Sequence, residues 1–306
     1  MRTRRESLNG WAFIAFPLAI LFLFTALPTV IGVGLSFFEW SGGGVPRFIG
    51  LQNYREAMAD RALWPAVGNT LLFAAVSVPV TTLIAFLLAT AVNARWFVGR
   101  ALVRTLFFLP TVVSIVAVGF LWRWILEPSD AGLLNSLLDR TARWVAACLG
   151  HTGPMNIDWP AWLGNTPWAL ATIIAVSIWR GLGFSIVLYL AALGNVPREH
   201  YDAAAVDGAG PWQALWHITY PGVRPMTYFL LITGMIGALQ VFDMVLIMIG
   251  TIEQPWTDVL NLFLYREFLG NRLGFAATLG VIVLVLSAVV TAAQGIWLRA
   301  TREATA

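Results

Sequence analysis

Six long apolar runs dominate the chain and limit what it can fold into. A helix needs about 20 consecutive apolar residues to cross the hydrocarbon core of a bilayer. Hydrophobic residues make up 58% of the 306 residues and charged residues only 11%, whereas soluble domains carry about 25% charged residues. We therefore expect an all-α fold, a polytopic membrane protein with six transmembrane helices. The predicted spans are residues 11–38, 69–92, 105–126, 168–193, 226–250 and 274–298.

The first apolar run is expected to be a span and not a cleaved signal peptide. Residues 1–10 form a short basic tail, which signal peptides also have. However, the run that follows is far longer than the about 7–15 residues of a signal-peptide core, and no small-residue cleavage site follows it. Residues 11–306 are thus expected to form one transmembrane domain. We expect Pro17 and Pro28 to bend its first span, and Pro110 to break the third span near its start.

The distribution of arginine predicts the orientation in the membrane. Six spans would place both termini on one side, and ten arginines fall on that side against seven on the other. Because cytoplasmic loops carry an excess of basic residues, the termini and the loop at residues 196–225 are predicted to be cytoplasmic. On the opposite side, amphipathic stretches at 133–149 and 258–269 are predicted to be interfacial or packing helices rather than binding sites.

The loop at residues 196–225 carries signals for two short helices. Pro197 suits a first helical position, and the alanines at 203–205 favour helix. Gly208 and Gly210 are expected to end the first helix, and Pro211 to start the second, which should stop before Pro221. Taken alone, such a stretch is also compatible with an ordinary loop between two helices.

This loop resembles the EAA loop in the membrane subunits of bacterial ABC importers. That pattern is roughly E-A-A-x-x-D-G-A, about nine further residues, and then I-x-L-P. The matching segments here are Asp202-Ala203-Ala204, Asp207-Gly208-Ala209 and Ile218-x-Tyr220-Pro221. Asp202 replaces the usual Glu and Tyr220 the usual Leu. The resemblance implies that the loop couples to an ATPase through Asp202, Ala203, Ala204, Asp207, Gly208, Ala209 and Pro221.

Outside the loop, further segments resemble carbohydrate-type ABC importer permeases of the maltose, glycerol-phosphate and multiple-sugar group. They include Gly50-Leu-Gln-Asn53-Tyr54, Asn69-Thr70, Gly99-Arg100 and Phe242-Asp243. The resemblance implies a type I importer (MetI-like) fold and import of a sugar, polyol or sugar phosphate, driven by ATP hydrolysis in a separate subunit. One segment departs from the pattern: Gly250-Thr-Ile-Glu253-Gln-Pro255 replaces the usual Gly-Gly-Pro after the fifth span.

The resemblance also implies a set of partners. They are a second homologous permease subunit, a dimeric cytoplasmic ATPase, and a periplasmic or lipid-anchored solute-binding protein, in a bacterial inner membrane. No cofactor is expected in this chain, since ATP and magnesium would be bound by the ATPase, and no nucleic acid is implied. The sequence agrees: it has no G-x-x-x-x-G-K-[ST] loop, so it is not expected to be an enzyme. No metal site is predicted, because the histidines at 151, 200 and 217 have no ligand spacing.

Three ionisable residues fall inside the predicted spans, where such residues are costly and usually functional. Arg123 lies near a span end beside Trp122 and Trp124, as an interfacial anchor would. Arg180 and Asp243 lie deeper, and either form a structural ion pair or line a cavity for a polar solute. Aromatic, amide and charged side chains suit a sugar, which has an apolar face and a rim of hydroxyls, but they also suit other polar solutes.

The resemblance places the family's sugar-contacting positions in this cavity. Counted from the shared motifs, they fall at Thr111, Ser177, Arg180, Gly181, Phe184, Gln240 and Asp243. One alternative function is a secondary transporter in which Arg180 and Asp243 relay a proton or an ion. Another is an intramembrane enzyme, for which the spans would have to hold a catalytic group of residues, and none is visible.

Overall fold

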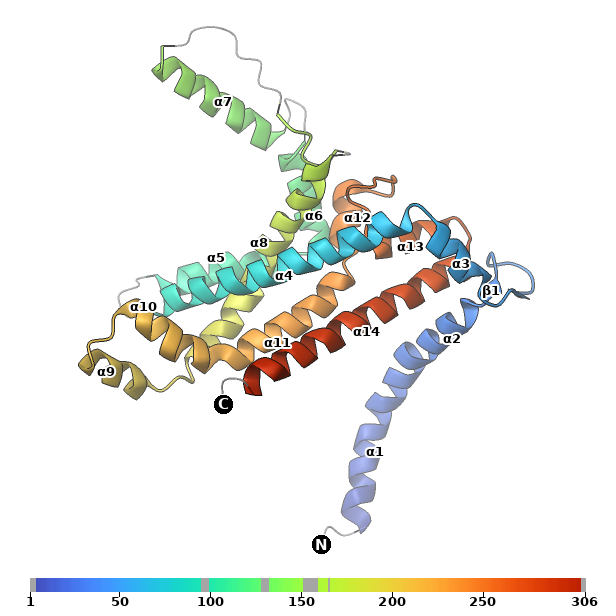
Figure 1. Cartoon of the computed structure of the whole chain (residues 1–306), viewed down its shortest axis with the longest axis horizontal. Coiled ribbons are helices and arrows are strands. Elements are labelled where there is room, and N and C mark those ends of the chain that lie inside the picture. Colours follow the sequence, from blue (N-terminus) through green and yellow to red (C-terminus); the bar gives the residue numbers. More distant parts are fainter. Residues whose placement is uncertain (1–3, 95–98, 128–131, 151–158, 165, 304–306) are drawn as a thin grey trace. The chain divides into compact units, whose positions relative to one another are not determined.

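The computed structural model describes residues 4–94, 99–127, 132–150, 159–164 and 166–303. These residues are mainly helical, with one short antiparallel pair of strands, β1 (Phe38–Glu39) and β2 (Arg47–Phe48) (Figure 1). The helices, with two π-helical turns labelled η, are α1 (Arg4–Leu21), η1 (Phe22–Ala26), α2 (Leu27–Leu35), α3 (Gln52–Ala59), α4 (Leu63–Asn93), α5 (Arg100–Val112), α6 (Ile115–Ile125), α7 (Leu133–Cys148), α8 (Pro167–Leu193), α9 (Arg198–Val206), α10 (Pro211–Ala214), η2 (Leu215–Thr219), α11 (Tyr220–Leu239), α12 (Asp243–Ile249), α13 (Leu260–Leu269) and α14 (Leu273–Glu303).

Five helices in the described part of the chain are long and apolar enough to cross a membrane. They are Phe13–Leu35, Leu63–Asn93, Pro167–Leu193, Pro211–Leu239 and Leu273–Leu298. The helices Ala101–Val112 and Ile115–Ile125 supply a sixth if they count as one span, although they are bent by 98° at their junction. The predicted fold class, an all-α polytopic membrane protein, is confirmed.

The prediction that Pro110 breaks the third apolar run near its start is wrong. Helix α5 continues through Pro110 and ends at Val112, and the chain turns at Val113, whose ψ of 141° is extended. Ser114 then starts α6, and its side chain accepts a hydrogen bond of 3.3 Å from the backbone N–H of Val116. The break therefore lies at Val113, directly before the N-cap Ser114, whose side chain satisfies one of the free amides at the start of α6.

The loop helix that was expected to stop before Pro221 instead continues into the next span. Helix runs unbroken from Pro211 to Leu239. Pro221 lies in the first turn of α11, directly after the π-helical turn Leu215–Thr219. A proline inside a helix removes one backbone hydrogen bond, and the π-turn directly before it changes the hydrogen-bond register at that point. The proline is therefore accommodated without ending the helix.

The fifth apolar run, predicted as one span over 226–250, is also divided. Helix α11 ends at Leu239, residues Gln240–Phe242 are not helical, and α12 starts at Asp243. Asp243 thus lies in the first turn of α12, where the helix dipole favours a carboxylate. The break places two polar residues, Gln240 and Asp243, at exposed positions on either side of an irregular turn.

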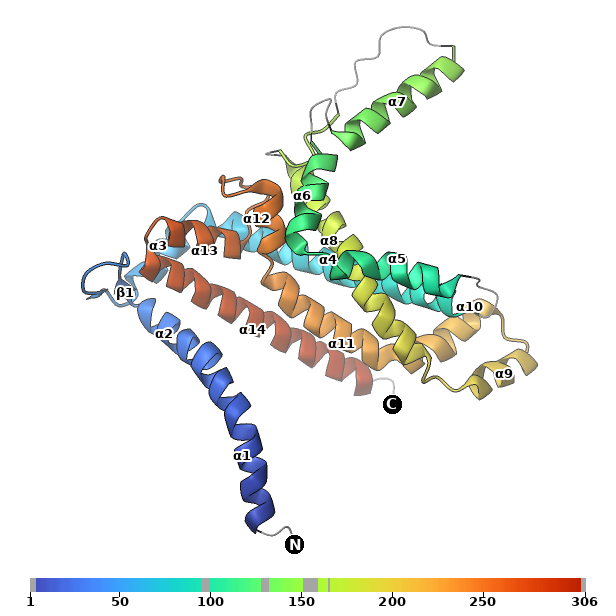
Figure 2. The same cartoon turned by 180° about the vertical axis from the view of Figure 1, so that it is seen from behind.

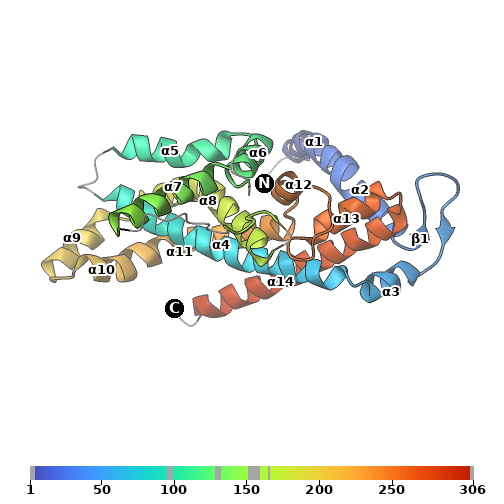
Figure 3. The same cartoon turned by 90° about the horizontal axis from the view of Figure 1, so that it is seen from above.

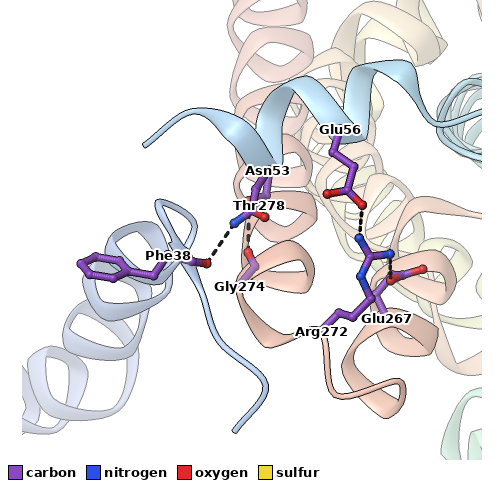
Figure 4. Close-up of polar contacts among 7 residues, drawn as sticks. All are labelled: Phe38, Asn53, Glu56, Glu267, Arg272, Gly274 and Thr278. Carbon is purple, nitrogen blue, oxygen red and sulfur yellow. Dashed lines mark hydrogen bonds and ion pairs between the residues drawn. The ribbon is translucent and has the colours of Figure 1, made fainter. Parts of the chain in front are cut away.

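The chain divides into two compact units, and the first comprises Met1–Leu63 and Phe263–Leu286. Asn53 on α3 donates hydrogen bonds of 3.0 Å to the backbone carbonyls of Ser36 and Phe38 (Figure 4). Thr278 on α14 donates to the Ser36 carbonyl as well, at 3.1 Å. Gly274 has no room for a Cβ, because the carbonyl of Phe38 occupies that space. These contacts hold the end of α2 and strand β1 against α3 and α14.

An ion-pair network adds to the first unit. Arg272 reaches Glu56 on α3 and Glu267 on α13, and it also lies 4.2 Å above the ring of Phe275 (Figure 4). Because all three charged side chains keep contact with water, the network contributes mainly to orientation and only modestly to stability.

The second unit comprises Trp64–Leu262 and Ser287–Ala306. In it α5 and α11 pack on α8, and α6 packs on α12 (Figures 1 and 2). Helices α9 and α10 lie at one end of this unit and α6 and α12 at the other, which Figure 3 shows from above. Two apolar clusters form its core. One contains Ile173, Val245 and Met248, and the other contains Phe86 and Ile186.

The segment that replaces the Gly-Gly-Pro pattern is tied to the start of α4. Asn69 donates hydrogen bonds of 2.9 Å to the carbonyls of Pro255 and Asp258. The hydroxyl of Thr70 accepts a hydrogen bond of 3.0 Å from the backbone N–H of Leu260. The Asn-Thr pair therefore satisfies backbone groups of a loop almost two hundred positions away along the chain.

Candidate functional site

A cavity of about 590 Å³ lies in the second unit, enclosed by α4, α5, α8, α11 and the turn before α12. Along α4 and α8 its lining residues fall between the two apolar clusters, so the cavity is near the middle of both helices. All seven positions predicted to contact the solute line it: Thr111, Ser177, Arg180, Gly181, Phe184, Gln240 and Asp243. The structure therefore brings together residues that are up to 132 positions apart.

Helix α8 supplies four of these residues from one face. Ser177, Arg180, Gly181 and Phe184 have the spacing i, i+3, i+4 and i+7, which places side chains one above another on a helix. The hydroxyl of Thr111 near the end of α5 donates a hydrogen bond of 3.1 Å to the backbone carbonyl of Arg180. Thus the bend between α5 and α6 is joined to the centre of α8 at the cavity wall.

Gly183 allows α5 and α8 to approach this closely. A Cβ at this position would overlap the backbone carbonyl of Phe107 and would lie 2.7 Å from the hydroxyl oxygen of Thr111. Both distances are too short for a real side chain, so α5 could not keep its position against any larger residue.

Arg180 and Asp243 form no ion pair with each other, as judged from these two described side chains and their contacts. The Nε of Arg180 is buried and has no hydrogen-bond partner within the described chain. A buried donor without a partner is costly. Of the two interpretations that the sequence left open, the structure does not have the ion pair, and both residues line the cavity; binding of a solute there stays a prediction.

Further polar groups of the cavity are also available. Within the part of the chain that is described, the side chains of Ser77, Thr81 and Ser177 make no hydrogen bond. By contrast, Thr82 donates to the carbonyl of Val78 at 2.8 Å and is satisfied within its own helix. Sequence reasoning missed Ser77 and Thr81, although their spacing of four residues in an otherwise apolar run is a signal for a shared helix face.

The predicted coupling residues lie at the opposite end of α8 from α6 and α12. The chain turns at Gly208, whose φ of +76° is left-handed, and the amide of Ala209 donates a hydrogen bond of 2.9 Å to the carbonyl of Ala204. Ala204, Asp207, Gly208 and Ala209 line a shallow pocket of about 330 Å³ with residues of α10 and η2. Asp202 lines a separate, larger pocket beside Trp212, Ala203 is exposed on α9, and Pro221 lies in α11.

The remaining sequence predictions have simpler outcomes. Arg123 is exposed in the last turn of α6. No group of three or more His, Cys, Asp or Glu residues that could hold a metal ion occurs in the described part of the chain, and His151 lies outside that part.

Comparisons with known proteins agree with this arrangement. Residues 82–303 match the model of a protein family described as the binding-protein-dependent transport system inner membrane component, and the chain belongs to this family. It is a permease subunit, a multi-pass membrane protein that serves transport and is not itself an enzyme.

Two curated relatives and two solved structures are similar over most of their length. The chain is 32% identical to the lactose transport system permease protein LacF of Rhizobium radiobacter, over 95% of this chain and 94% of that protein. It is 29% identical to the arabinooligosaccharides transport system permease protein AraP of Bacillus subtilis, over 90% of this chain and 84% of that protein. A bacterial ABC transporter for import of the acidic polysaccharide alginate matches with a TM-score of 0.79 and 26% identity, over 98% of this chain and 99% of that chain. A second structure of a bacterial alginate ABC transporter, in complex with an alginate-bound periplasmic protein, matches with the same TM-score, over 96% of each chain.

Proposed function

We propose that the cavity on α8 is the passage for a sugar, or a related polyol or sugar phosphate, on its way into the cytoplasm. The observation that carries this proposal is the convergence of seven separated residues on one cavity, in which the described hydroxyls of Ser77, Thr81 and Ser177 make no hydrogen bond. The relatives named for lactose and arabinooligosaccharides, and the neighbour named for alginate, support a carbohydrate.

The lining has the chemistry that a sugar ring requires. Phe184 is 50% exposed and presents an apolar ring face for the C–H side of a sugar. Hydroxyls of Ser77, Thr81 and Ser177 and the charged groups of Arg180 and Asp243 are placed for the hydroxyl rim. The volume of about 590 Å³ is within the range of about 300–1,000 Å³ that holds small ligands.

The loop at residues 196–225 serves, in this proposal, as the docking element for a separate ATPase, which binds ATP and magnesium. The exposed turn at Gly208 and the small alanine face of α9 support close contact with another protein. The termini then lie in the cytoplasm of a bacterial cell, and a second permease subunit and a solute-binding protein complete the importer. The neighbour solved with a periplasmic protein supports the latter partner.

Transport by the complete complex in proteoliposomes tests the cavity. Lactose, an arabinooligosaccharide and an alginate oligosaccharide serve as probes. We expect Phe184→Ala to raise the KM for a transported sugar about tenfold, because the substitution removes one aromatic contact and the apolar area that it buries. Phe229→Ala is the matched control, because Phe229 is 49% exposed and does not line the cavity. Equal effects of the two changes would contradict the proposed passage.

The energy source separates this proposal from a secondary transporter. We expect uptake to stop when the ATPase subunit is left out and to continue when a protonophore collapses the proton gradient. Uptake that follows the gradient and ignores the ATPase would instead support a relay through Arg180 and Asp243.

A further inference from the structure

Helix α7 has two distinct faces, with Thr141 as the one polar residue within the apolar arc; its hydroxyl donates a hydrogen bond of 2.7 Å to the Leu137 carbonyl. At 100° per residue, one half of its circumference is apolar and the other half is polar. The apolar arc consists of Leu133, Leu134, Leu137, Leu138, Trp144, Val145, Cys148 and Leu149. The polar arc consists of Asn135, Ser136, Asp139, Arg140 and Arg143.

The polar edge of α7, and not its apolar arc, carries the hydrogen bonds to the rest of the chain. The indole N–H of Trp162 donates a hydrogen bond of 2.8 Å to the side-chain oxygen of Asn135, which is buried. The indole N–H of Trp159 donates a hydrogen bond of 2.7 Å to the carboxylate of Asp139, one turn further along. In a water-soluble domain an amphipathic helix does the reverse and packs its apolar face inward.

Most of the apolar arc is therefore uncovered. Leu137 is 50% exposed, Trp144 69% and Leu149 78%. Beside them, an apolar groove of about 500 Å³ runs along α7, lined by Leu138, Thr141, Ala142, Val145, Ala146, Leu149 and Trp159. Among the residues that the structure describes, no charged side chain lines this groove. A continuous apolar surface of this kind needs an apolar partner.

The span ends next to α7 indicate what this partner is. Trp124 in the last turn of α6 is 57% exposed, and Trp168 in the first turn of α8 is 60% exposed. Tryptophans at the ends of spans are typical of the boundary between lipid and water. Helix α7 begins eight residues after α6 ends. The chain therefore enters α7 within a few residues of a span end that carries an exposed tryptophan.

We propose that α7 lies in the membrane interface, with its apolar arc in the acyl chains and its polar arc toward water. Arg140 lies on the polar arc, where it can reach lipid phosphates, while Arg143 on the same arc pairs with Asp139 at 2.9 Å. An interfacial helix inserts by about 5–10 Å. A solute-binding protein is a less suitable cover, because a protein that binds reversibly would expose the arc to water whenever it dissociates, whereas lipid surrounds a membrane protein at all times. The inference needs only the membrane location and is independent of the solute.

Spin labelling of α7 tests this inference without altering the native sequence. Cys148 is the only cysteine in the chain, is exposed and belongs to the apolar arc. The permease complex, labelled there with a nitroxide, is placed in nanodiscs of phosphatidylethanolamine and phosphatidylglycerol. Collision rates with oxygen, which concentrates in lipid, are compared with those of a nickel chelate, which stays in water. We expect oxygen to dominate at Cys148.

Two variants in a Cys148→Ser background complete the experiment. Leu137→Cys places the label on the apolar arc, and Arg143→Cys places it on the polar arc as the matched control. We expect oxygen to dominate at position 137 and the nickel chelate at 143, a reversal between the two arcs. Equal access of the nickel chelate to both arcs would refute the interfacial location. A label at 137 that becomes protected only when a solute-binding protein is added would also refute it, in favour of protein docking.

Discussion

The hydroxyl of Thr111 on α5 donates a hydrogen bond of 3.1 Å to the backbone carbonyl of Arg180 on α8. This bond joins two features of the cavity wall, the sharp bend that follows α5 and the helix that carries four lining residues. Because Thr111 is satisfied by a backbone group, its position does not depend on a bound solute. The contact between α5 and α8 is therefore part of the resting architecture of the site.

Gly183 should be the position of this contact that is least tolerant of change. We expect Gly183→Ala to destabilise the protein by about 1–3 kcal/mol, as overpacking does elsewhere, because the added methyl group would displace Phe107. Thermal unfolding in detergent measures the effect. Gly295→Ala is the control: no atom lies within 4 Å of its added Cβ, so the melting temperature should stay the same or rise.

Asp243 should matter for transport and not for assembly. It forms no ion pair with Arg180, so Asp243→Ala does not leave the charge of Arg180 without its partner. We expect normal amounts of assembled complex and a melting temperature within about 2 °C of that of the unaltered protein, because substitutions at exposed positions change stability little. Transport should nevertheless fall strongly. A complex that dissociates after this substitution would show that Asp243 has a structural role instead.

Gly208 should be required for ATPase docking. Its φ of +76° is unfavourable for a β-branched residue, so Gly208→Val should distort the turn between α9 and α10. We expect the variant to reach the membrane in normal amounts and to lose the ATPase subunit on co-purification. Gly210→Ala is the matched control, because Gly210 has a φ of −73° and its added Cβ meets only the side chain of Gln213 at 3.9 Å. Retention of the ATPase by Gly208→Val would argue against this turn as the docking point.

The attachment of α7 should depend on pH. The hydrogen bond from Trp159 lowers the pKa of Asp139 below its usual value of 3.8, and Arg143 lowers this pKa further. A depressed folded-state pKa stabilises the fold above the unfolded-state pKa, and this contribution is lost as the pH falls through the folded-state pKa. The mobility of a label at Cys148 should therefore increase below about pH 4.

Two tryptophan substitutions separate titration from simple loss of contact. Trp159→Phe removes the hydrogen bond to Asp139 itself, so the label should be more mobile at neutral pH and its mobility should no longer change as Asp139 is protonated. Trp162→Phe removes a bond to Asn135, which does not titrate, so it should increase mobility and keep the pH transition. A transition that persists in Trp159→Phe would mean that Asp139 does not control it.

The pattern of apolar runs was sufficient to predict the fold class, because runs of span length have few alternatives in a membrane. Counting residues from the shared family motifs was also sufficient to select Thr111, Gln240 and Asp243, which line one cavity although they come from different parts of the chain. The breaks were not predictable in the same way. Pro110 was the obvious candidate for a break, yet the chain turns at Val113, where the cap at Ser114 and the packing of α6 on α12 decide the geometry.

The π-helical turn at Leu215–Thr219 explains why Pro221 does not end the helix. Local rules place a helix end before a proline, but they take no account of a π-helical turn that shifts the hydrogen bonds upstream. Likewise, the absence of an ion pair between Arg180 and Asp243 depends on side-chain positions that residue spacing does not determine.

The unbroken helix from Pro211 to Leu239 has a mechanical consequence. Its 29 residues form a rod about 44 Å long, with the turn at Gly208 near one end and Gln240 at the other. Rotation of such a rod about one end by only about 5° displaces the opposite end by about 4 Å, given that length. A small rotation at the end near Gly208 is thus enlarged to a displacement of several ångström at the cavity.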